Sequence, residues 1–282
     1  MGEYFFTDYF PLVLLLTFVF GVSIGSFVNV LIFRLRSGVT LRGRSKCLSC
    51  ATPLKSKHLI PLFSYLFQRG RCAFCGVRIS LQYPAVEAIL GLLYVAVLLV
   101  HNFNPSTSTL QEVVFILLDA TVWTILLAVT VYDLRHKIIP DSFSLTIALV
   151  AGFSLFLKWQ FGVLPMHVLP FLEFGTLPVW IDLAAGPLLF LPFGALWFFS
   201  GGRAMGLGDA KLAWGLGWFL GFPYGVTAIV LAFWIAFIPS IFLLLSSSKT
   251  FTMKSEIPFA PFLVLGALAT YVLEINILTW TF

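Results

Sequence analysis

Long apolar runs divide the 282-residue chain, and they limit its possible folds more than any other feature. Hydrophobic residues make up 60% of the chain and charged residues only 10%, whereas soluble domains are about 25% charged. A helix needs about 20 apolar residues to cross a bilayer, so the second, fourth and sixth runs are short. The sequence predicts an all-α polytopic membrane protein with about eight transmembrane helices. These lie at roughly 9–33, 84–100, 112–132, 142–158, 180–200, 210–222, 224–246 and 259–280.

Lysine and arginine are concentrated in segment 34–80, which holds ten of the 17 and no Asp or Glu. Basic loops stay on the cytoplasmic side of bacterial membranes. If successive spans alternate in direction on either side of this segment, every Lys and Arg except Lys158 lies on the cytoplasmic side. Both termini then lie on the outer face. We expect the basic segment to face anionic lipid, and we expect no nucleic-acid partner. The predicted parts are a first transmembrane helix (1–33), a cytoplasmic cysteine domain (34–83) and a transmembrane core (84–282).

All four cysteines lie in the basic segment, as two C-x-x-C pairs, Cys47 with Cys50 and Cys72 with Cys75. This spacing resembles a zinc ribbon, in which four thiolates complete the tetrahedral shell of one ion. A loop this small makes a poor core by itself, so a metal would stabilise it. We expect a structural zinc, because a closed four-thiolate site leaves no position for water. Redox-active thiols, disulfides or a site that has lost its metal remain alternatives.

Two aspartates are predicted to meet at the cytoplasmic ends of membrane spans. Asp133 ends the third apolar run, and Asp209 begins the sixth after Gly206 and Gly208. An acid beside a membrane span is costly and indicates a functional site. The alternative for Asp209 is a helix N-cap after a glycine turn. Two carboxyl groups that share one proton can act as base and acid on water and a carbonyl group, which is the chemistry of an aspartic protease.

Two other acids near this region have simpler interpretations. Asp119 lies fourteen residues before Asp133, about 21 Å along a helix, so we expect a polar packing contact within the bundle. Asp141 follows Pro140 and is predicted to cap the fourth helix. The chain has no H-E-x-x-H pair, no phosphate-binding loop ending in Lys-Ser/Thr and no Gly-x-Ser-x-Gly elbow, which argues against those chemistries.

The order of motifs resembles the bacterial type IV prepilin peptidases, which cleave leader peptides and methylate the new N-terminus. The resemblance covers most of the chain. Two departures are Leu48 in place of a common proline and the acid Asp119. The matching segments are Gly25–Val30 with Arg34, the two cysteine pairs, Ile79–Ser80 with Tyr83–Glu87, Asp133 with Ile139–Asp141, Gly206–Lys211 and Pro258–Phe262.

The resemblance implies a substrate, a reaction and a location. Type IV prepilins and type II secretion pseudopilins would be cut after a Gly on the cytoplasmic face of the inner membrane. S-adenosylmethionine would then methylate the new amine, at a site that we do not place, with Glu87 and the basic loop as candidates. Asp133 and Asp209 would be catalytic, supported by Gly206, Gly208 and Lys211.

Two other functions compete with the peptidase. A transporter could use Asp133 and Asp209 as a proton or cation relay, but its polar sites should lie near the bilayer midplane. A membrane scaffold could use the cysteine loop to dock a partner. The predicted position of both acids at one membrane face favours the peptidase.

Overall fold

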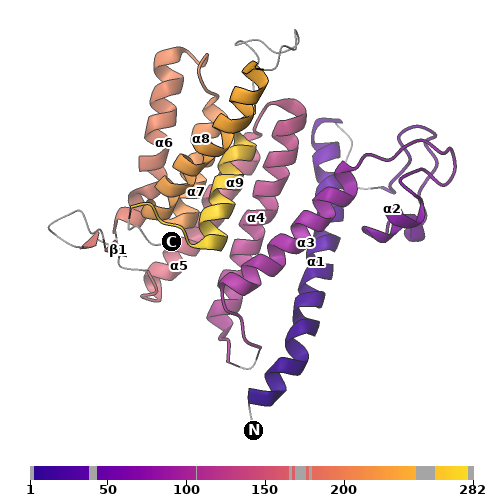
Figure 1. Cartoon of the computed structure of the whole chain (residues 1–282), viewed down its shortest axis with the longest axis horizontal. Helices are drawn as coiled ribbons and strands as arrows, with labels where there is room; N and C mark the ends of the chain where they lie inside the picture. Colours follow the sequence, from indigo (N-terminus) through magenta and orange to yellow (C-terminus); the bar gives the residue numbers. More distant parts are fainter. Residues whose placement is uncertain are drawn as a thin grey trace. The chain divides into compact units, whose positions relative to one another are not determined.

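The computed structural model divides the chain into two compact units, residues 1–106 and 107–282 (Figure 1). Each is described separately. The structure describes residues 3–37, 43–105, 107–164, 167–168, 176–177, 180–245 and 258–278.

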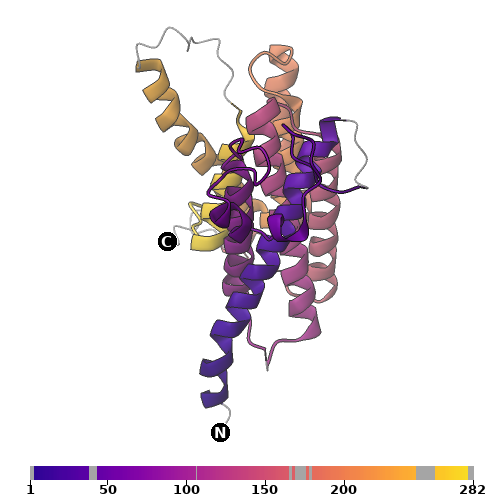
Figure 2. The ribbon, with the colours of Figure 1, turned by 90° about the vertical axis from the view of Figure 1, so that its right-hand side faces the viewer.

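The first unit is a pair of antiparallel helices joined by the cysteine segment. Helix α1 (Glu3–Ser37) packs along α3 (Gln82–Val100), and both views show the two side by side (Figures 1 and 2). The helices in the described part of the segment between them are a 3₁₀ turn, η1 (Ser56–His58), and the five-residue α2 (Phe63–Phe67). The cysteine segment therefore has little regular structure to support it, as expected for a short polar loop.

The second unit is a helical bundle with one small strand pair. Helix α4 begins with a capping box, in which Thr109 and Glu112 each accept a backbone N–H of the other. The strands pair antiparallel through His167–Leu177 and Val168–Thr176. In order, the elements are α4 (Leu110–His136), α5 (Asp141–Gln160), β1 (His167–Val168), β2 (Thr176–Leu177), α6 (Trp180–Ser200), α7 (Leu207–Leu220), α8 (Phe222–Leu245) and α9 (Ala260–Leu273).

Helix α7 is the centre of this bundle, because it contacts α5, α6, α8 and α9. Close approach to α6 requires a glycine: a Cβ on Gly217 would lie 2.6 Å from the carbonyl oxygen of Ala185. Small residues commonly let membrane helices approach in this way. A single residue, Gly221, separates α7 from α8 and adopts a φ of +80°. The buried Asp182 of α6 fixes this joint, because its carboxylate accepts the N–H of Phe222 at 2.8 Å.

The predicted apolar runs correspond to α1 and α3–α9, so the helical class is confirmed for the described residues apart from the two-residue strands. Six helices in the described part are long and apolar enough to cross a membrane, and α9 is a shorter apolar helix. The chain is therefore a multi-pass membrane protein, while the count of eight stays a prediction. The predicted ends of the last two runs, at 246 and 279–280, lie outside the described residues, as do Arg42, Lys249 and Lys254.

Candidate active site and cysteine cluster

The end of α4 meets the start of α9 at Asp133, which lies in the last turn of α4 and is 4% exposed. The backbone N–H of Ala260, the first residue of α9, donates to its carboxylate. The N-terminus of a helix carries partial positive charge and favours a carboxylate there. Asp133 is thus held between α4 and α9, which are far apart in sequence.

Asp209 lies in the first turn of α7, outside the six long apolar helices. Its carboxylate accepts the backbone N–H of Gly206, the N-cap residue, as an N3 acid does in a capping box. Burial and the nearby charge of Asp133 raise the pKa of Asp209 to about 6, against the effect of the Gly206 N–H. The two carboxyl groups are therefore near enough to influence each other's ionisation.

Gly208 lets the loop after α4 lie against the start of α7. A Cβ at this position would be 3.0 Å from the Cβ of Ile139, which is tighter than ordinary van der Waals contact. Gly206 has an ordinary φ of −75° and serves as the N-cap. The Gly-x-Gly-Asp sequence therefore brings α7 onto the 137–140 loop and places Asp209 beside the end of α4.

Lys211 joins the same corner through an ion pair, because its Nζ lies 2.6 Å from Oδ1 of Asp141. This pair corrects the prediction that Asp141 caps α5. The N-cap is Pro140, no side chain caps the helix, and Asp141 is the first helical residue. No local sequence pattern predicts this pair, because its partners are 70 residues apart.

Asp119 is separated, as predicted, from Asp133 and Asp209, the pair of acids called the dyad below. It is 2% exposed, and its Oδ2 accepts the hydroxyl of Tyr271 at 2.8 Å. Rings of Trp123 and Phe219 surround this hydroxyl-bearing side chain. The expected polar packing contact is therefore confirmed: Asp119 links α4 to α9 within the bundle.

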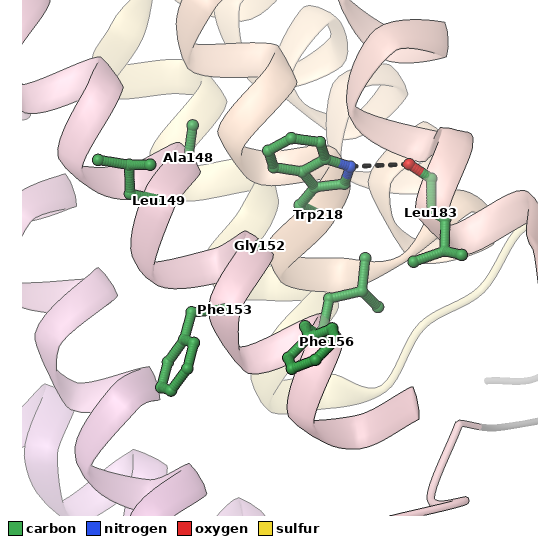
Figure 3. A pocket seen from close by; sticks show the side chains of 8 residues that line it. Ala148, Leu149, Gly152, Phe153, Phe156, Leu183 and Trp218 are labelled. Atoms are coloured by element: carbon green, nitrogen blue, oxygen red, sulfur yellow. Dashed lines mark hydrogen bonds between the residues drawn. The ribbon is translucent and has the colours of Figure 1, made fainter. Parts of the chain in front are cut away.

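An apolar hollow of about 310 Å³ lies between α5, α6 and α7. Figure 3 shows the Trp218 indole N–H donating to the Leu183 carbonyl oxygen, at 2.9 Å, beside Gly152 and Phe156. It has no ionisable lining residue, so it is not the reaction site.

The four cysteines of the first unit gather at one point. All four Sγ atoms lie within 4.8 Å of one another, and Cys47 Sγ is 3.8 Å from Cys75 Sγ. Four sulfurs at about 2.3 Å from one zinc ion would lie about 3.8 Å apart in a tetrahedron. The thiols are free, so the spacing fits a metal site and not disulfides.

Two matching hairpin turns position these thiols. The N–H groups of Ala51 and Gly76 donate to the carbonyl groups of Cys47 and Cys72, each four residues earlier. Both turn residues have positive φ, +56° for Ala51 and +70° for Gly76. Each C-x-x-C pair is therefore the tip of a tight turn that points both thiols in one direction.

Hydrogen bonds prepare two of the thiols as ligands. The Thr52 side chain and backbone lower the pKa of Cys50 to about 6. The backbone N–H groups of Cys75 and Phe74 lower the pKa of Cys72. His58 packs edge-on against Phe74 and is not part of the four-thiol group. A divalent ion would relieve the repulsion among thiolates this close together.

Glu87 and Asn29 form a second polar group in the first unit, between α1 and α3. Glu87 is 7% exposed and Asn29 is 2% exposed. Glu87 Oε2 accepts the Leu62 N–H at 2.8 Å, and Asn29 Nδ2 donates to the Tyr83 carbonyl oxygen at 3.1 Å. The sequence named Glu87 as a candidate, but the contact with Leu62 had no sequence signal, because it spans 25 residues.

Two protein-family models match the chain, one within the first unit and one within the second. Residues 19–101 match the bacterial peptidase A24 N-terminal domain, and residues 120–244 match the type IV leader peptidase family. The first range contains the four cysteines and Glu87, and the second contains Asp133 and Asp209. No solved structure matches the chain.

Several curated relatives share the name prepilin leader peptidase/N-methyltransferase. The Aeromonas hydrophila protein is 32% identical, over 89% of this chain and 87% of its own length. The Bacillus subtilis protein is 29% identical, over 93% and 95%. The Myxococcus xanthus protein is 36% identical over 51% of this chain and 41% of its own length. The chain therefore belongs to the type IV leader peptidase family.

Proposed function

We propose that the protein is a membrane aspartyl endopeptidase that removes the leader of type IV prepilins and type II secretion pseudopilins. The observation that carries this is that Asp133 of α4 lies near enough to Asp209 of α7 for its charge to affect that carboxyl group, although the two residues are 76 positions apart. Family membership supports the substrate class. Cleavage after a Gly at the cytoplasmic face is part of the proposal.

The influence of the Asp133 charge on Asp209 supports a shared proton. The raised pKa of Asp209, to about 6, favours a state in which one carboxyl group is protonated and the other ionised. The ionised group takes a proton from water as the water attacks, and the protonated group donates a hydrogen bond to the scissile carbonyl oxygen. Gly206 and Ala260 hold the two carboxylates by backbone N–H groups, and Lys211 with Asp141 fixes the corner beside them.

The second proposed activity is methylation of the new N-terminal amine. The names of the relatives carry this activity, and S-adenosylmethionine is the proposed methyl donor. The proposed cofactor of the cysteine loop is one structural zinc ion on Cys47, Cys50, Cys72 and Cys75, supported by the sulfur spacing. A closed four-thiolate shell stabilises the loop and leaves no position for a reacting water.

The proposed setting is the bacterial inner membrane, with segment 34–80 and the dyad facing the cytoplasm. Ten of the 17 Lys and Arg residues in that segment support this orientation. Eight spans complete the proposal; the short sixth span runs from about residue 210 to 222, so Asp209 lies just before it on the cytoplasmic side, and α9 is also short. Labelling of single cysteines in 34–80 by an impermeant reagent in intact cells should fail, and ready labelling would contradict the orientation.

One reaction tests both activities. Purified full-length protein in detergent is incubated with a prepilin and S-adenosylmethionine, and the N-terminus of the product is identified by mass spectrometry. We expect cleavage after the leader Gly and a mass increase of one methyl group. Intact prepilin would contradict the peptidase, and a cleaved product with an unmodified amine would contradict the transferase.

A further inference from the structure

Glu87 is a buried carboxylate, and the described residues of the first unit provide it with no cationic partner. Within the described residues, no Lys or Arg forms an ion pair with it. Its hydrogen bonds come from neutral donors, the Leu62 N–H and the Ser26 hydroxyl. A buried carboxylate is normally paired or neutralised, so a cationic ligand beside Glu87 would stabilise its ionised form.

Asn29 adds a second acceptor beside it. Its Nδ2 is used by the Tyr83 carbonyl group, but its Oδ1 is buried with no partner among the described residues. Ser26 and Asn29 are three residues apart on α1, and Tyr83 and Glu87 are four apart on α3, so each pair lies on one helix face. The Ser26–Glu87 and Asn29–Tyr83 contacts are therefore neighbouring rungs, about one helical turn apart.

The two helices are pressed together at this point. A Cβ on Gly25 would lie 2.8 Å from Cα of Glu87. This close approach leaves the carboxylate and the amide oxygen on facing helix surfaces. Both are acceptors, so the group favours a ligand that carries positive charge and several N–H donors.

The cysteine loop closes the group from one side. Leu62, whose N–H donates to Glu87, has a φ of +59°, a conformation that residues other than glycine rarely adopt. Such strain persists only where surrounding contacts enforce it. Glu87 therefore connects the helix pair to the loop that the four cysteines fold.

We propose that Ser26, Asn29 and Glu87 bind the N-terminal ammonium group of the cleaved pilin and that Glu87 accepts its proton before methyl transfer. An α-ammonium group has three N–H donors, and its pKa of about 7.7–8.0 leaves it mostly protonated at neutral pH. It must lose a proton to become a nucleophile. This inference rests on the proposed transferase function and locates its acceptor site in the first unit.

Proton transfer comes before methyl transfer. A proton leaves the ammonium group for the Glu87 carboxylate, and the freed nitrogen lone pair forms a bond to the methyl carbon of an S-methyl sulfonium donor. The carbon–sulfur bond breaks, its electron pair stays on sulfur, and a neutral thioether departs. No oxidant or reductant is required.

Glu87→Gln is the decisive variant, because glutamine can still accept the Leu62 N–H while it loses the charge and the basicity. The probe is a synthetic peptide with the N-terminal apolar sequence of a mature pilin, used with a free or an acetylated N-terminus. Binding of each peptide and of S-adenosylmethionine to the full-length protein in detergent is measured separately. Methylation of the free peptide, cleavage of prepilin and metal content are measured in parallel.

We expect Glu87→Gln to bind the free peptide roughly ten- to a hundredfold more weakly, since it loses a charge-assisted hydrogen bond. Binding of the acetylated peptide and of the donor should not change. Methylation should fall at least about a hundredfold, the loss typical of a removed proton acceptor. Cleavage and metal content should stay at the wild-type level. Asn29→Leu should weaken free-peptide binding by a smaller factor, and Glu112→Gln, a charge-matched change in a helix cap, should change none of these.

Three results would overturn the proposal. Full methylation by Glu87→Gln would exclude a proton acceptor at this position. Weaker binding of S-adenosylmethionine with unchanged peptide binding would show that Ser26, Asn29 and Glu87 bind the methyl donor and not the amine. Joint loss of metal, cleavage and methylation would make Glu87 a structural support of the loop. Because wild-type protein is tested in the same assay, absence of methylation there would refute the proposed function separately.

Discussion

The two units hold their acids in different ways. In the second unit, Asp133 and Asp209 lie at helix ends, held by backbone N–H groups and coupled by mutual repulsion. In the first unit, Glu87 lies on a helix face beside Ser26 and accepts a hydrogen bond from the loop that contains the four cysteines. The first arrangement depends on how helices pack, and the second depends on how a small loop is stabilised. Damage to one should therefore spare the chemistry of the other.

The largest effect is expected from the dyad. Asp133→Asn or Asp209→Asn keeps the side-chain size but removes the shared ionisation, so cleavage should fall at least about a thousandfold. The double variant should be little worse, because the two residues act as one unit. Methylation of a pre-cleaved peptide should continue, which separates the two units. Rates are followed by mass spectrometry of the products.

Asp119→Asn is the matched control, since it also changes a buried acid of α4 and asparagine can still accept the Tyr271 hydroxyl. It should retain substantial cleavage. Full cleavage by either dyad variant would contradict the aspartyl mechanism.

The cysteine loop should give the reverse pattern. Cys72→Ser should reduce the metal content from about one zinc per chain to near zero, because structural sites need all four ligands. The loop then loses its fold, Leu62 no longer holds Glu87, and methylation should fall more than cleavage. Elemental analysis and both activity assays test this. Stoichiometric disulfides without metal in the wild-type protein would refute the zinc proposal.

The pH dependence should differ between the two activities. Because burial and Asp133 raise the pKa of Asp209 to about 6, the dyad keeps its shared proton well above the range of an exposed aspartate. Cleavage should fall at low pH, where both groups are protonated, and again as the pH rises above the pKa of the protonated group, by about tenfold per pH unit. The two apparent pKa values of this pH profile belong to the pair of carboxyl groups and not to either residue alone. Cleavage rates in wild-type protein that stay constant from pH 4 to 8 would contradict a shared proton.

The smallest effect concerns the two cysteine turns. Ala51 and Gly76 occupy the same place in each turn with positive φ, but only glycine adopts it without steric cost. Ala51→Gly should therefore stabilise the metal-loaded protein by about 0.5–1 kcal/mol, and Gly76→Ala should destabilise it by about 1–2 kcal/mol. Thermal unfolding with metal present measures both. A destabilising Ala51→Gly would show that the turns are not equivalent.

The sequence predicted the features that are local or strongly periodic. Apolar runs located the helices, the C-x-x-C spacing located the thiol cluster, and the acids at span ends located the dyad. It missed the contacts made between distant segments. The Lys211–Asp141 pair, the Ala260 N–H on Asp133 and the Leu62 N–H on Glu87 follow from tertiary packing, which no local pattern encodes. Asp141 was assigned as a cap because a local rule was applied where a partner 70 residues away decides its role.

Because one residue, Gly221, joins α7 to α8, a small tilt of α7 at this joint moves its other end. Helix α7 has 14 residues and is about 21 Å long, with Asp209 at one end and the Gly221 joint at the other. A tilt of about 5° about the joint would move the Asp209 end of α7 by about 2 Å. In enzymes, a misplacement of about 1 Å can already cost about a hundredfold in rate. Asp182 fixes this joint, so Asp182→Ala should lower the cleavage rate, measured as for the aspartate variants, although it acts at the opposite end of α7 from Asp209.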